Sequence, residues 1–123
     1  KKLVKELALE DNISFTGSQS KIAEIYTLSD IVVSSSKKPE SFGRAVAEAI
    51  AMNTPVIATN HGGVKDIIIE NINGFFFEVG DEKMLANNIF KSKELKFDGY
   101  KYISENFSLE NMVDKTIEVY KGL

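Results

Sequence analysis

The sequence has no cysteine and a single histidine, His61, among its 123 residues. A chain without cysteine forms no disulfide framework and no thiolate metal site, and one histidine cannot build a multi-histidine metal centre. We therefore expect no metal site. The lack of cysteine is also compatible with a reducing compartment, and we expect a cytoplasmic location.

The sequence also lacks a surplus of basic charge and long apolar runs. With 15 basic and 18 acidic residues, the net charge is −3, whereas nucleic-acid binding is typical of a basic surplus. No apolar run approaches the length of a membrane span. We expect no nucleic-acid partner and no membrane span in this chain. Its hydrophobic content of 43% suits a globular domain with a buried core.

Short β-branched and aromatic runs alternate along the chain with patterns of helical period. The expected strands are residues 13–16, 31–34, 55–59 and 75–79. The expected helices are residues 20–28, 44–52, 64–68, 81–90, 100–107 and 108–120. This alternation with short connections predicts an α/β fold with a parallel sheet flanked by helices. The chain begins within a helical pattern, so we expect it to be part of a longer protein.

The most informative stretch is residues 34–63, which runs from a Ser/Lys-rich loop through a helix and a strand to a second loop. In a parallel sheet, the loops that follow the strands at 31–34 and 55–59 lie at the same edge. Ligands of open α/β sheets bind at that edge, outside the carboxyl ends of the strands.

The expected helix at 44–52 is apolar nearly all round, so we expect it to be buried, with Glu48 as its one carboxylate. A buried charge needs a partner, and Glu48 points back toward the start of the helix. The free N–H groups there, at Phe42 to Arg44, form a site for phosphate together with the helix dipole. A nucleotide fits this arrangement, with its diphosphate on the amides, its ribose on Glu48, and Glu40 facing the group attached to the phosphate.

A second interpretation of Glu48 stays open. Arg44 and Glu48 are four residues apart, so they can pair on one face of the helix without any ligand. His61 also has two interpretations. Because it follows the strand at 55–59, its ring can hydrogen-bond a bound sugar or phosphate, or it can simply face solvent.

Several segments carry a resemblance to a known family, namely Glu40-Ser41-Phe42-Gly43, Glu48-Ala49, Pro55-Val56-Ile57-Ala58 and Gly62-Gly63. Together they resemble the donor-binding core of retaining GT-B glycosyltransferases, of the glycosyl transferases group 1 or family 4 type. The segments Ile13-Ser14-Phe15-Thr16-Gly17, Leu28-Ser29-Asp30-Ile31-Val32-Val33 and Asn73-Gly74-Phe75 resemble flanking parts of the same domain. Two positions depart from the family's pattern, because Asn53 replaces its usual Gly and Asp66 replaces its more common Glu.

The resemblance implies the C-terminal, donor-binding domain of such an enzyme, with a Rossmann-like parallel sheet of six strands in the order 3-2-1-4-5-6. In this family the strand at 13–16 is the third, so the first two strands are missing from the chain. We therefore expect residues 1–123 to be a single, partial domain. The acceptor-binding N-terminal domain would be absent, and the isolated chain would transfer no sugar.

The resemblance also implies roles for individual residues. The substrate would be a nucleotide-diphosphate sugar, transferred with retention of configuration and without a cofactor or metal. Glu40 would act on the donor sugar as the catalytic residue, and Glu48 would bind the ribose. The remaining donor-binding residues would be Ser41, Phe42, Gly43, His61 and Gly17, the last of these near the base.

Two other functions are compatible with the residues. A nucleotide-sugar epimerase shares the GT-B architecture, although it normally needs further acid and base groups and the chain has one histidine. A binding-only module, which senses a nucleotide or docks a partner, would not need both glutamates. The oligomeric state, the base, the sugar and the acceptor are not indicated by the sequence.

Overall fold

The computed structural model describes residues 1–17, 20–37 and 43–107. Its helices and strands, in chain order, are α1 (Lys2–Glu6), α2 (Ile22–Leu28), β1 (Val32–Ser34), α3 (Arg44–Ala51), β2 (Val56–Thr59), the 3-10 helix η1 (Gly62–Asp66), β3 (Gly74–Phe77), α4 (Glu82–Ser92) and α5 (Gly99–Phe107). The helix expected at 108–120 lies outside the described residues. No helix in the described ranges has the length and apolar character that crossing a membrane requires.

The sheet is parallel, with its described strands in the order β1-β2-β3. Ile57 of β2 lies opposite Val33 of β1 and Phe75 of β3. All four residues of β2 are buried, as expected for a strand with neighbours on both edges and helices on both faces. The α/β class with a parallel sheet flanked by helices is thereby confirmed.

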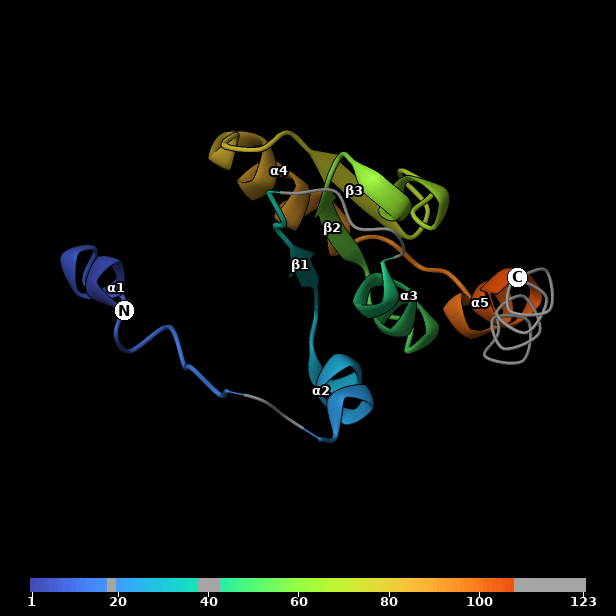
Figure 1. The fold of residues 1–123 in the computed structure, drawn as a ribbon, viewed down its shortest axis with the longest axis horizontal. Coiled ribbons are helices and arrows are strands. Elements are labelled where there is room, and N and C mark those ends of the chain that lie inside the picture. Colours follow the sequence, from blue (N-terminus) through green and yellow to red (C-terminus); the bar gives the residue numbers. More distant parts are fainter. Residues whose placement is uncertain (18–19, 38–42, 108–123) are drawn as a thin grey trace, which may run out of the picture.

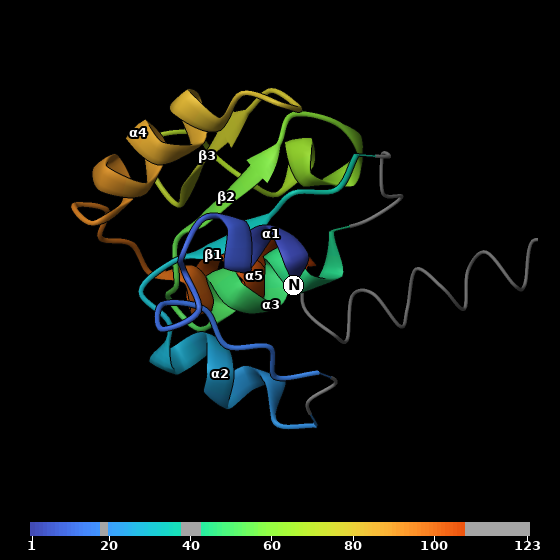
Figure 2. The ribbon, with the colours of Figure 1, turned by 90° about the vertical axis from the view of Figure 1, so that its left-hand side faces the viewer.

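Helices cover both faces of this sheet. Helix α4 packs on β2 and β3, while α3 packs on β1 and β2 and is itself covered by α2 and α5. Figure 2 shows α4 on one side of the strands and α3 with α5 on the other. The side of α3 that faces the sheet and α5 supplies much of the core, through Val46, Ala47, Ala49 and Ile50.

Helix α3 is less enclosed than its composition predicts. We expected burial nearly all round, but Ala45 is exposed, and Glu48 is only half-buried. The reason is that α3 has packing partners on the sheet and on α2 and α5, while the remaining stripe faces outward. Small alanine side chains tolerate that exposure at little cost, so an apolar composition did not require complete burial.

The prediction of a strand at residues 13–16 is wrong. Residues 13–17 form no strand, and the side chains of Ile13 and Phe15 are 40% and 59% exposed. Figure 1 shows this segment and α1 extending away from the sheet. A strand exists only where a neighbour completes its hydrogen bonds, and among the described residues β1 pairs with β2 alone. Val33 of β1, which has no described strand on its other side, is 42% exposed.

The backbone conformation and hydrogen bonding of Asn53 explain why asparagine can replace the glycine that is usual at this position in the family. Its backbone is left-handed, with φ at 62°, the region that glycine and asparagine adopt most readily. Its side-chain Oδ1 accepts a hydrogen bond of 2.8 Å from the backbone N–H of Gly99, at the start of α5. The asparagine therefore turns the chain out of α3 and caps a second helix.

This dual role gives a stability prediction. Asn53→Ala should lower the free energy of unfolding by about 2 kcal/mol, because it loses the cap and strains a left-handed backbone. Asn53→Gly should lose only the cap and cost about 1 kcal/mol. Urea unfolding of both variants tests this, and equal losses would show that backbone strain contributes nothing at this position.

Candidate functional site

The candidate site lies where the first two strands end. Strands β1 and β2 are parallel, so Ser34 and Thr59 lie at the same edge of the sheet (Figure 1). The chain leaves β1 there toward residues 38–42 and returns as α3, while the loop that follows β2 leads into η1. One sheet edge therefore brings together both loops and the beginning of α3, as the sequence predicts.

Gly43 fixes the start of α3 against η1. It is the N-terminal cap residue of α3 and is buried, and a Cβ built on it would lie 2.6 Å from Cγ1 of Val64. This close approach leaves no room for a side chain unless Val64 moves. Since no described side chain caps α3, its first N–H groups have no side-chain acceptor within the described residues. Such a helix start is suited to bind an anion.

Glu48 forms an ion pair with Arg44. Nε of Arg44 lies 3.0 Å from Oε1 of Glu48, and the two side chains are 76% and 38% exposed. The pairing that the sequence left open is therefore present. Exposed pairs four residues apart in a helix contribute only about 0.3–0.5 kcal/mol, so this pair holds the carboxylate weakly.

Glu48 also influences a tyrosine in the neighbouring helix. Burial, and secondarily the charge of Glu48, raise the pKa of Tyr26 above its ordinary value. Tyr26 is buried in α2, which packs on α3. Burial, and secondarily the charge of Asp66, likewise raise the pKa of Tyr102 in α5, whose hydroxyl donates to the carbonyl of Ile67 at 2.8 Å.

His61 is bound to the loop that follows β1. Its Nε2 lies 2.8 Å from the carbonyl oxygen of Ser36, and Thr59 Oγ1 donates to the same oxygen at 2.7 Å. Nδ1 of His61 is buried without a hydrogen-bond partner among the described residues. This cluster was not found by sequence reasoning, because Ser36 lies more than twenty residues before its two partners along the chain.

The structure brings some predicted site residues together and separates another. Gly43 and His61 both lie beside η1, Gly43 against Val64 and His61 as its N-terminal cap residue, while Glu48 lies further along α3 and pairs with Arg44. Gly17 has φ at +65° and open space around it, and it lies in the segment between α1 and α2 that Figure 1 shows away from that edge. Glu40, Ser41 and Phe42 lie outside the described residues.

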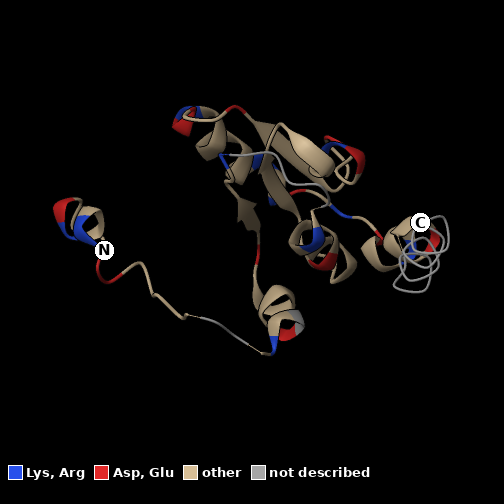
Figure 3. Cartoon of the chain, in the orientation of Figure 1, with Lys and Arg blue, Asp and Glu red and all other residues tan. Residues whose placement is uncertain are grey.

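Charge does not single out this edge. Figure 3 shows basic and acidic residues interspersed on α1, α3 and α4 rather than gathered on one face. The described residues contain no group of three or more His, Cys, Asp or Glu side chains arranged to hold a metal ion.

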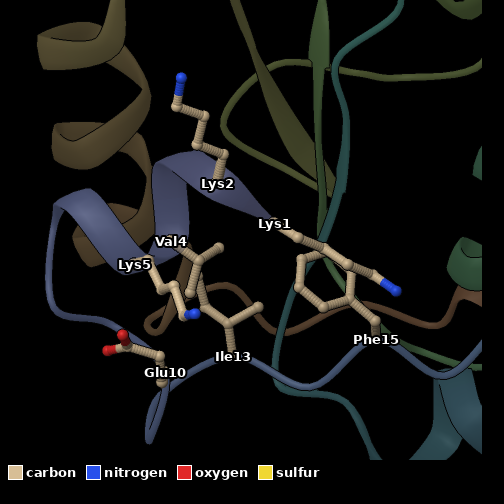
Figure 4. Close-up of a pocket in the computed structure, with 7 residues that line it drawn as sticks. All are labelled: Lys1, Lys2, Val4, Lys5, Glu10, Ile13 and Phe15. Atoms are coloured by element: carbon tan, nitrogen blue, oxygen red, sulfur yellow. The ribbon is translucent and has the colours of Figure 1, made fainter.

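A hollow of ≈ 720 Å³ lies elsewhere, between α1 and the extended segment that follows it. Its lining residues are Lys1, Lys2, Val4, Lys5, Glu10, Ile13 and Phe15. Figure 4 shows Val4 and Ile13 pointing toward one another, with the Lys1 amine near the Phe15 ring. The predicted donor-site residues do not contribute to this hollow, so its size does not make it the candidate site.

The fold and this sheet edge define a class, an α/β domain with a Rossmann-like parallel sheet. A family model, "Glycosyl transferases group 1", matches residues 1–110 of the chain. The chain therefore belongs to the group 1 glycosyltransferase family. Among curated proteins, the N-acetyl-alpha-D-glucosaminyl L-malate synthase of Bacillus anthracis is 34% identical over 96% of this chain and 32% of its own length.

Solved structures show the same relationship. A glycosyltransferase from Rickettsia africae matches with 36% identity and a TM-score of 0.86, over 98% of this chain and 34% of that one. HepE of Anabaena, solved in complex with UDP-glucose, matches with 26% identity and a TM-score of 0.86, over 99% and 35% of the two chains. The chain thus spans about a third of the length of these relatives.

Proposed function

We propose that this chain forms the donor-binding part of a retaining glycosyltransferase that uses a nucleotide-diphosphate sugar. The observation that carries the proposal is the start of α3 at the carboxyl edge of the sheet, uncapped by any described side chain and with the Glu48 carboxylate on the same helix. The UDP-glucose complex of HepE supports a nucleotide sugar as the ligand of this fold.

Each predicted residue has a role in this proposal. The backbone N–H groups of Phe42 and Gly43 bind the diphosphate, and Glu48 accepts hydrogen bonds from the ribose hydroxyls. Glu40 faces the transferred sugar and acts on it. The helix dipole offsets part of the diphosphate charge, so the proposal needs no metal and no cofactor.

The proposal also covers the remaining predicted donor-site residues and the acceptor substrate. Ser41 and His61 border the donor, and Gly17 lies near the base once its segment is in place. The acceptor is bound by an N-terminal domain. The transferred group is a hexose or a hexose derivative, and the reaction takes place in the cytoplasm.

The test of this proposal is Glu48→Gln, with UDP affinity measured by titration calorimetry. The change keeps the shape of the side chain but removes its charge, so UDP should bind about 5- to 150-fold more weakly, which corresponds to about 1–3 kcal/mol for hydrogen bonds to a charged group. Thermal stability should change little, because the pair with Arg44 is exposed.

Arg44→Gln is the matched control, because it breaks the same ion pair from the other side. UDP affinity should fall clearly further in Glu48→Gln than in Arg44→Gln. Equal affinities in the wild type and in Glu48→Gln would mean that Glu48 serves only the ion pair and that the ribose contact is wrong.

A further inference from the structure

A single carbonyl group ties together the two loops at the candidate site. Ser36 stands two residues beyond β1, Thr59 is the last residue of β2, and His61 follows two residues later. Thr59 Oγ1 and His61 Nε2 lie 2.7 and 2.8 Å from the Ser36 carbonyl oxygen. A carbonyl oxygen has two lone pairs, so these two donors fill its capacity.

This geometry assigns the tautomer of the neutral His61 ring. Because a carbonyl can only accept, Nε2 must carry the hydrogen, and Nδ1 is then an acceptor. The only N–H of the neutral ring is therefore directed at the protein's own backbone. The neutral ring can therefore hydrogen-bond a ligand only by accepting at Nδ1, which is buried without a partner among the described residues.

We propose that His61 and Thr59 are positioning residues that hold the start of the loop between β1 and α3. The inference rests on the proposed function, because that loop carries the Glu40–Gly43 motif. Fixing the Ser36 carbonyl sets where the chain leaves β1, only a few residues before the motif. A misplaced motif weakens donor binding, since a small displacement of binding groups is costly.

Two isosteric variants separate positioning from direct ligand contact. The amide nitrogen of Gln reaches the place of His Nε2, whereas the amide of Asn reaches only the place of Nδ1. His61→Gln should therefore bind UDP more tightly than His61→Asn, because it keeps the hydrogen bond to the Ser36 carbonyl. His61→Asn should weaken UDP binding about threefold to tenfold, the range that the loss of one hydrogen bond explains.

Two threonines provide a matched pair. Thr59 and Thr54 are both buried in or beside β2, and each donates its hydroxyl to a distant backbone carbonyl. Thr54 Oγ1 lies 2.6 Å from the carbonyl of Tyr26, at the opposite end of the strand. Thr54→Val and Thr59→Val should lower thermal stability similarly, but only Thr59→Val should weaken UDP binding, again about threefold to tenfold.

A second measurement does not depend on a ligand. Amide hydrogen exchange at residues 35–37, followed by NMR, should be faster in Thr59→Val and His61→Asn than in Thr54→Val and His61→Gln. The positioning role is overturned if the four variants exchange alike there, or if His61→Asn binds UDP better than His61→Gln. If a version extended to the length of its relatives does not bind UDP, the proposed function fails, while the exchange comparison in the 123-residue chain still decides whether the two residues hold the loop.

Discussion

Gly99→Ala should lower the free energy of unfolding by about 3 kcal/mol or more, because α5 begins in direct contact with the backbone of α3. A Cβ built on Gly99 would collide with the carbonyl oxygen of Ile50 and would lie 2.9 Å from Cε2 of Phe97. A backbone oxygen cannot move aside as a flexible side chain can. The start of α5 would have to withdraw from α3 and would lose the hydrogen bond from Gly99 to Asn53.

The expected sign of the stability change distinguishes Gly99 from an ordinary helical glycine. Inside an ordinary helix, replacing glycine by alanine stabilises the protein by about 1 kcal/mol, the reverse of the effect expected here. Thermal unfolding followed by circular dichroism should show a loss of more than about 10 °C. Gly80→Ala is the control, since the space around Gly80 is open and only its positive φ resists the change. A Gly99→Ala variant as stable as the wild type would mean that α5 does not approach α3 this closely.

The elements that local sequence specifies were predictable. The run at 55–59 is β-branched and sits between a helix and a glycine-containing loop, and it forms the buried strand β2. Asp81 stands at the start of the helix expected at 81–90, and its Oδ1 accepts from the N–H of Met84 at 3.0 Å, as a helix cap does. The cap joins residues three positions apart, whereas β2 was indicated by its local composition although both strands that pair with it are distant along the chain.

The failures involve interactions that the local sequence does not reveal. Residues 13–16 have the composition of a strand, but a strand also needs a hydrogen-bonded neighbour, which composition does not reveal. The hydrogen bonds from Thr59 and His61 to the Ser36 carbonyl join residues 23 and 25 positions apart, and no local sequence pattern predicts them. Glu48 was ambiguous for a different reason, because spacing allows both an ion pair and a ligand contact, and the two do not exclude each other.

On the side of β1 that faces away from β2, no described strand pairs with its backbone groups. The N–H of Val32 bonds to the carbonyl of Pro55 in the connection to β2. Since backbone groups alternate in direction along a strand, the N–H and C=O of Val33 point away from β2. Unpaired strand edges of this kind are a liability, and the apolar side chains of Leu3, Phe15 and Leu28 are exposed as well. We propose that further strands of the same domain pair with β1, and that the segment at 13–16 packs beside them.

This proposal predicts that the 123 residues transfer no sugar by themselves. Catalysis requires both reactants to be positioned together, and a donor site without an acceptor domain cannot supply that. The chain should be incubated with UDP-glucose and a panel of acceptors, beside a version extended to the length of its relatives. We expect turnover from the extended version alone. Comparable rates from both would contradict the proposal.

Hydrogen exchange tests the structural basis of the same prediction independently of any acceptor. The Val33 amide should exchange rapidly in the 123-residue chain and become protected in the extended version, where a neighbouring strand accepts its hydrogen bond. The Ile57 amide is the control, because β2 lies between β1 and β3 in the chain itself and is already buried. Equal protection of Val33 in both versions would show that no strand joins this edge. Inactivity of the short chain would then reflect the lack of an acceptor site rather than an incomplete sheet.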